Sequence, residues 1–219
     1  MTEVINSPTS AVPDARLLIA PGCAHCPIVL DGLSALVKDG RLGRLEVVNI
    51  AAHPEAAQAA GTRTVPWFTI GPFTLTGAHS PSELAEWAER ARNGSGLTAY
   101  FSHLLESNRL DDVIRMLKRG EGKLQELVPL LEGLDTPMAV RIGVGAVIEE
   151  FADTDELAAA VDSLAALVDS EQPQVRADAC HYLGLSRSPA AIPFLAACRD
   201  DDDEEVREIA AESLAMIPR

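Results

Sequence analysis

The chain has 219 residues, of which 47% are apolar and 23% are charged, and its formal net charge is −15. This length is sufficient for two domains with hydrophobic cores. Residues 1–95 carry 9 acids and 7 bases, whereas residues 96–219 carry 24 acids and 11 bases. The acidic second part argues against a surface for nucleic acids or anionic membranes, and it is compatible with a solvated helical face or with a basic protein partner.

No basic residue and no apolar run precede Arg16, so residues 1–13 are expected to form a loose tail rather than a signal peptide or a membrane span. We therefore expect a cytoplasmic protein. The chain has four cysteines, and two of them, Cys23 and Cys26, form a C-x-x-C motif. This usage fits redox chemistry in a reducing compartment better than a structural disulfide framework.

The C-x-x-C motif lies between a predicted strand at 15–20 and a predicted helix at 28–38. At a helix N-terminus, unpaired backbone N–H groups and the helix dipole stabilise a thiolate. Cys23 is therefore the expected nucleophile and Cys26 the resolving thiol. A thiol pKa lowered from about 8.5 to about 7 speeds attack only about threefold, but it makes Cys23 a better leaving group and the pair a stronger oxidant.

The following segments continue an alternating pattern of strands and helices. We expect a strand at 45–50, a short helix at 54–60, strands at 64–70 and 73–76, and a helix at 83–92 that is capped by Ser82. Pro66 must lie at an edge or at the start of its strand, because proline has no N–H for the sheet. The predicted order is β-α-β-α-β-β-α.

This element order resembles the thioredoxin fold over residues 14–93. The resemblance rests on the C-x-x-C motif after the first strand and on Val65-Pro66 before the third strand. Pro27 and the T-V-P-W-F segment at 64–68 are similar to the glutaredoxin-related domain of the flavoprotein reductase in alkyl hydroperoxide reductase systems, and to archaeal small redox proteins. The resemblance implies that Pro66 is a cis proline facing the cysteines, that Val65 presents its backbone to an extended substrate, and that Gly77 borders the groove.

His25, directly before the second cysteine, is similar to the C-x-H-C pattern of protein disulfide isomerase relatives. A nearby imidazolium would favour the Cys23 thiolate, so His25 is expected to tune the redox poise. Trp67 is either a wall of the groove or a core residue on the other strand face. The other histidines, at 53, 79, 103 and 181, have no ligand spacing and are expected at the surface or in packing.

Residues 94–96 are predicted to be a linker, and residues 97–219 show only helical patterns. Val-Arg pairs begin similar helices at Val140, Val175 and Val206, and each has a shorter helix before it, near 128–131, 161–164 and 192–195. Helix pairs that recur every 31 to 35 residues resemble short bacterial HEAT repeats, over about 121–218. Residues 97–120 would form a divergent capping pair.

Two features of the helical part have alternative interpretations. Cys180 and Cys198 are either a second redox pair or small buried thiols, and the second interpretation is favoured because no activating feature surrounds them in the sequence. The acidic run at 199–205 is either a site for a cation or partner, or a turn with N-cap acids before the last helix.

The predicted fold is thus an α/β thioredoxin fold followed by an all-α HEAT-like solenoid. The predicted function is a thiol–disulfide oxidoreductase, with Cys23 and Cys26 catalytic, His25 tuning, and Val65, Pro66, Trp67 and Gly77 binding the substrate. Its partners would be a client protein at the cysteines and a protein on the repeats, without cofactor, metal, nucleic acid or membrane. The alternative is a non-catalytic adaptor that is redox-responsive or binds a soft metal through the two cysteines.

Overall fold

The computed structural model describes residues 12–133 and 135–218 of the chain. The chain divides into two compact units, Met1–Gly96 and Leu97–Arg219. Most of the predicted tail at 1–13 lies outside the described residues. In the described part of the chain, no helix is both long enough and apolar enough to cross a membrane.

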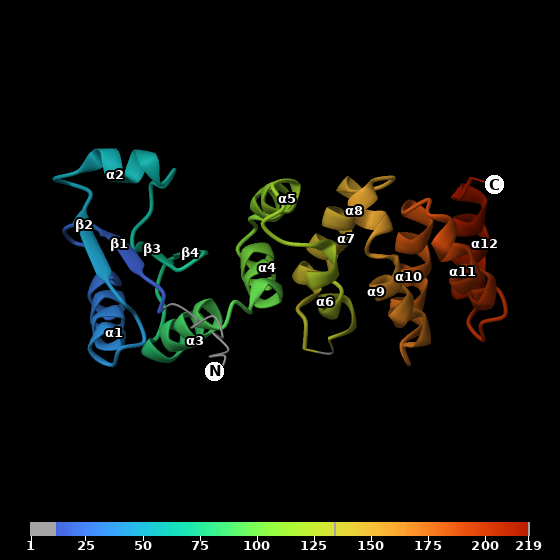
Figure 1. Ribbon diagram of the computed structural model, residues 1–219, viewed down its shortest axis with the longest axis horizontal. Coiled ribbons are helices and arrows are strands. Elements are labelled where there is room, and N and C mark those ends of the chain that lie inside the picture. The colour runs from blue at the N-terminus through green and yellow to red at the C-terminus, as the bar shows by residue number, and fades with distance from the viewer. Residues whose placement is uncertain (1–11, 134, 219) are drawn as a thin grey trace, which may run out of the picture. The chain divides into compact units, whose positions relative to one another are not determined.

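The first unit contains one mixed sheet and three helices (Figure 1). Its elements are β1 (Ala15–Ile19), α1 (Cys26–Lys38), β2 (Leu45–Asn49), α2 (Pro54–Ala59), β3 (Trp67–Ile70), β4 (Phe73–Thr76) and α3 (Pro81–Arg92). The strand order is β2-β1-β3-β4, in which β1 is parallel to β2 and antiparallel to β3, and β3 is antiparallel to β4. The sheet is therefore small and mixed, with β1 in its interior.

One face of the sheet carries the core of the first unit. The register places Leu17, Phe68 and Leu75 side by side, and all three side chains are fully buried. Helices α1 and α3 pack against each other and against the sheet, and Trp87 of α3 contacts Phe73 with ring centroids 5.1 Å apart. Helix α2 lies apart from these two helices (Figure 1).

Several predicted boundaries in this unit are wrong, and β1, β2 and α2 each end one residue earlier than predicted. Helix α1 begins at Cys26 rather than at residue 28, because Pro27 already adopts the helical φ and lacks only an N–H that the first turn leaves unpaired. Strand β3 begins at Trp67 rather than at residue 64, just after Pro66. The cap of α3 is Ser80 rather than Ser82, since Ser80 Oγ accepts from the Glu83 N–H and Glu83 accepts from the Ser80 N–H.

The second unit is a series of short helices that follow one another along the unit (Figure 1). It begins with α4 (Leu97–Glu106) and α5 (Leu110–Lys118), and the main elements after these are α6 (Pro129–Glu132), α7 (Met138–Glu150), α9 (Val161–Ala165), α10 (Pro173–Leu185), α11 (Ile192–Cys198) and α12 (Glu204–Met216). A short α8 (Asp155–Ala158) and three 3₁₀ turns (Leu124–Glu126, Ala166–Asp169, Pro189–Ala191) complete it. The short and long helices of each predicted pair are present.

The Val-Arg pairs have one packing role for the valine and one hydrogen-bonding role for the arginine. Val140, Val175 and Val206 are buried in the helix stack. The arginines that follow them donate to backbone carbonyls of the preceding turn, Arg141 to Gly133, Arg176 to Ser170, and Arg207 to Asp201 and Asp202. The repeated dipeptide thus packs one long helix and ties it to the turn before it.

Candidate functional site

The C-x-x-C motif forms a disulfide at the junction of β1 and α1. Gly22 has a φ of +79°, a left-handed conformation that glycine adopts without strain, and it turns the chain into Cys23. Cys23 and Cys26 are bonded to each other, with Cα atoms 5.5 Å apart. Cys26 is 5% exposed as the first residue of α1, whereas Cys23 is half-buried. Cys23 is therefore the sulfur that a partner molecule can reach.

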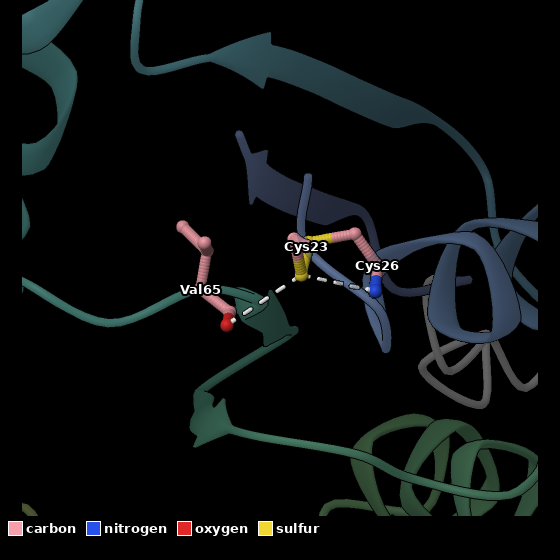
Figure 2. The surroundings of a disulfide bond; sticks show 3 residues. All are labelled: Cys23, Cys26 and Val65. Carbon is pink, nitrogen blue, oxygen red and sulfur yellow. Dashed lines mark hydrogen bonds between the residues drawn. A yellow bond between two sulfur atoms is a disulfide. The ribbon is translucent and has the colours of Figure 1, made fainter. Parts of the chain in front are cut away.

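A backbone N–H is directed at the accessible sulfur. The N–H of Cys26 donates to Cys23 Sγ at 3.1 Å (Figure 2). Cys23 lies just before the first turn of α1, where the positive end of the helix dipole acts. When the disulfide is reduced, this N–H and this dipole both favour the thiolate form of Cys23.

Residues from a distant part of the sequence complete the surroundings of Cys23. The carbonyl oxygen of Val65 lies 3.7 Å from Cys23 Sγ, although the two residues are 42 positions apart (Figure 2). The Val65–Pro66 peptide bond is cis, as the resemblance implies. Gly77, at the end of β4, donates its N–H to the carbonyl of Pro66 at 2.9 Å. The structure thus brings Cys23, Val65, Pro66 and Gly77 together.

The two remaining predicted site residues are less closely tied to the sulfurs. His25 is exposed and is the N-cap residue of α1, and within the described residues its imidazole has no hydrogen bond to either cysteine. Trp67 is half-buried and follows Pro66, on the face of β3 opposite to the buried Phe68. Trp67 therefore does not belong to the core face of the sheet.

Two residues near the site were not singled out by the sequence. Ile28 is 49% exposed in the first turn of α1, two residues after the buried Cys26. His79 is buried, stands edge-on to Phe68 with ring centroids 5.2 Å apart, and has Nδ1 3.4 Å from the carbonyl of Gly77. His79 is thus a packing residue, as expected, while Ile28 gives the rim of the site an exposed apolar side chain that periodicity would have placed on the polar side of α1.

The structure of the second unit bears on both alternatives left open by its sequence pattern. Cys180 and Cys198 are free and buried, as the favoured interpretation predicts. In the acidic run, Asp203 caps α12 by accepting from the N–H groups of Glu205 and Val206, and Asp201 pairs with Arg176. The described residues include no cluster of three or more His, Cys, Asp or Glu side chains that could hold a metal ion. The acidic run therefore supplies the N-cap of α12, as the second interpretation predicts.

Comparison with known proteins identifies the repeats. A family model described as HEAT repeats matches residues 124–215. No curated protein matches the chain. The chain therefore contains HEAT repeats, and it consists of an N-terminal α/β unit with a close cysteine pair followed by a helical unit with these repeats.

Proposed function

We propose that the N-terminal unit is a thioredoxin-like thiol–disulfide oxidoreductase and that the HEAT repeats select its client protein. The observation that carries this proposal is the surroundings of Cys23, whose sulfur is accessible, receives the Cys26 N–H at 3.1 Å and lies 3.7 Å from the Val65 carbonyl. The β2-β1-β3-β4 order, with α1 and α3 packed on the sheet, supports the thioredoxin-like assignment.

In the reducing direction, the Cys23 thiolate attacks one sulfur of a client disulfide. A bond forms between Cys23 and that sulfur, the client S–S bond breaks, and the other client sulfur leaves as a thiolate. Cys26 then gives up its proton and attacks Cys23, so that the Cys23–Cys26 disulfide closes and the second client thiol is released. The oxidising direction runs through the same mixed disulfide in reverse, and no other electron carrier enters the step.

The residues around Cys23 have separate roles in this scheme. The backbone of Val65 and Pro66 positions an extended client segment beside the sulfur, with Gly77 and Trp67 at the border of the groove. His25 lies in the motif itself and, as an imidazolium, stabilises the Cys23 thiolate through space, which makes the disulfide more oxidising. The acidic repeats favour a client whose docking surface is basic.

A trapping experiment tests the proposal in the source cells. Cys26→Ser leaves Cys23 able to attack and removes the thiol that resolves the mixed disulfide, so clients should accumulate as covalent adducts on non-reducing gels. Cys23→Ser is the matched control and should trap nothing. If Cys26→Ser yields no covalent adduct under conditions in which a known dithiol protein is trapped, the catalytic proposal is wrong.

The second candidate function is a redox-responsive adaptor without turnover. The HEAT repeats favour it, because stacks of such repeats commonly form protein-binding surfaces. Under this alternative, the Cys23→Ser variant keeps its protein partner in a non-covalent pull-down, and neither single variant forms adducts. The metal-binding form of the adaptor gains no support, since within the described residues no third ligand joins the cysteine pair.

A further inference from the structure

The other two cysteines of the chain meet in the interior of the helical unit. Cys180 lies in the middle of α10, and Cys198 is the last residue of α11. Cys180 is 0% exposed and Cys198 is 5% exposed. The two helices that carry them pack together, and each thiol has the other as the first cause of the shift in its pKa. Two thiols from separate helices are thus held side by side, although neither has a role in the proposed function.

An ion pair joins the same two segments next to the thiols. Arg176 precedes Cys180 by one helical turn, and Asp201 follows Cys198 in the turn after α11. Nε and Nη2 of Arg176 donate to the two carboxylate oxygens of Asp201 at 2.8 and 2.7 Å. The N–H of Asp201 also donates to the carbonyl of Cys198 at 3.2 Å. Contacts outside the thiols therefore hold together the two segments that carry them.

We propose that Cys180 and Cys198 form a second redox-active pair, which a small hydroperoxide closes to a disulfide between α10 and α11. The burial of both sulfurs selects the class of oxidant. A disulfide substrate must align three sulfur atoms in a line, which the packed interior does not admit, whereas hydrogen peroxide is close to water in size. The pair is a site of reversible modification within the repeats.

Cys198 is the thiol that reacts first, because it is the more exposed of the two. The hydrogen bond from the Cys180 thiol lowers the pKa of Cys198 by stabilising its thiolate, and it raises the pKa of Cys180, which holds the shared proton. Burial and the nearby carboxylates of Asp201 and Asp169 oppose the thiolate of Cys198, whereas Arg176 favours it. The oxidation is therefore expected to be slower than that of an exposed thiol of low pKa.

The reaction balances with one peroxide molecule. The Cys198 thiolate attacks a peroxide oxygen, an S–O bond forms, the O–O bond breaks, and hydroxide leaves and is protonated to water, which gives a sulfenic acid on Cys198. Cys180 then attacks the same sulfur, the S–S bond forms, the S–O bond breaks, and the leaving hydroxide takes the proton of Cys180 as a second water. Two electrons pass from the thiol pair to the peroxide, and an external dithiol returns them.

Closure of this disulfide would cross-link consecutive helices of the HEAT stack. The bond encloses the turn and the 3₁₀ segment between α10 and α11, so it restricts the unfolded chain and stabilises the folded repeats. A binding surface made by stacked repeats changes its stiffness when two of its helices are joined covalently. Oxidation would thus act on the client-selecting part of the chain, independently of Cys23 and Cys26.

The test uses the full chain with Cys23→Ser and Cys26→Ser, in which Cys180 and Cys198 are the only cysteines left. The reduced protein is exposed to hydrogen peroxide, quenched, denatured and treated with an alkylating agent. Peptide mass spectrometry should show loss of alkylation at both cysteines, a bridged peptide lighter by two hydrogens, and recovery of both thiols with dithiothreitol. The oxidised protein should also unfold at a higher temperature than the reduced one.

Cys180→Ala in the same background is the matched control, and it should show neither the bridged peptide nor the rise in unfolding temperature. The proposal is overturned if both thiols remain alkylatable after a peroxide exposure that consumes an exposed thiol on an added reference peptide. It is equally overturned if the only products are oxygen adducts or bridges between chains. Because the trapping experiment depends on Cys23, either result leaves the test of the oxidoreductase unaffected.

Discussion

Arg176 and Asp201 form a bidentate ion pair that connects α10 to the turn before α12. The two side chains are only 15% and 12% exposed, so water screens the pair weakly. The same guanidinium donates to the carbonyl of Ser170 at 3.0 Å, and Asp201 accepts from the N–H of Asp203 at 2.9 Å. One charge pair thus joins the turn before α10 to the turn before α12.

Removing one partner of this pair should destabilise the HEAT repeats. Asp201→Asn leaves the Arg176 guanidinium largely buried without its counter-charge, and we expect the free energy of unfolding to fall by roughly 2 to 3 kcal/mol. Chemical denaturation measures the change, and hydrogen exchange should place it in α10–α12. Asp202→Asn is the matched control, because the side chain of Asp202 is exposed and only its carbonyl accepts from Arg207. Equal losses in the two variants would show that the ion pair is not responsible.

The stabilisation by Asp201 should depend on pH. Hydrogen bonds from Arg176 lower the pKa of Asp201 below its usual value, so in the acid range the unfolded chain binds a proton more readily than the folded one. Its stabilisation is then fully present above the unfolded pKa of about 3.9 and is lost as the pH falls through the lower folded pKa. The stability gap between the wild type and Asp201→Asn should be constant near neutral pH and shrink below about pH 4. A gap that widens towards acid pH would contradict this assignment.

The helix pairs of the second unit were predictable because they repeat, and the match to HEAT repeats confirms them. A spacing of small and branched residues that recurs at Val140, Val175 and Val206 identifies the buried face of each long helix. The meeting of Arg176 with Asp201, and of Cys180 with Cys198, was not predictable in the same way. These contacts depend on the angles at which α10, α11 and α12 cross one another. The spacing of apolar residues in the sequence does not determine these crossing angles.

At the candidate site, the sequence predicted which residues belong to the site, and the structure shows how these residues are arranged around Cys23. The approach of the Val65 carbonyl to Cys23 follows from the pairing of β1 with β3, which the sequence suggests only through the resemblance. The exposure of Ile28 was not singled out from the sequence, although Ile28 lies one residue before Val29 and five before Leu33, and therefore off the helix face on which both are buried.

Gly184 should be required for the close approach of α10 and α12. A Cβ atom at this position would lie 2.6 Å from Cβ of Ser213 and 2.9 Å from its Cα, so the two helices would have to move apart. We expect Gly184→Ala to lower the free energy of unfolding by about 1 to 3 kcal/mol in spite of the better helix propensity of alanine. Thermal or chemical denaturation of the full chain measures this loss.

Gly143→Ala in α7 is the matched control for helix propensity. Its new Cβ would meet Cδ2 of Leu105 at 2.9 Å, which is the end of a side chain that can rotate away. We expect this variant to lose much less stability than Gly184→Ala, or to lose none. If the two variants lose the same amount, the packing of α10 on α12 is looser than the contact at Ser213 indicates.

Ile28 should contribute to the binding of protein clients but not to the chemistry of the Cys23–Cys26 disulfide. Its exposed side chain lies two residues after Cys26 in the first turn of α1, so a client segment bound at Cys23 can cover it. Replacing it by Asn removes about 1 kcal/mol of apolar contact, which corresponds to a roughly fivefold lower rate of exchange with a trapped client. The rate of reduction by a small dithiol should stay unchanged, because the surroundings of Cys23 contributed by Val65 and the Cys26 N–H are intact.

Val47→Asn, which alters an apolar side chain of similar exposure on β2, should leave both rates unchanged. A parallel fall in both rates for Ile28→Asn would instead mean that this residue supports the fold of the motif, and the client would have to dock elsewhere.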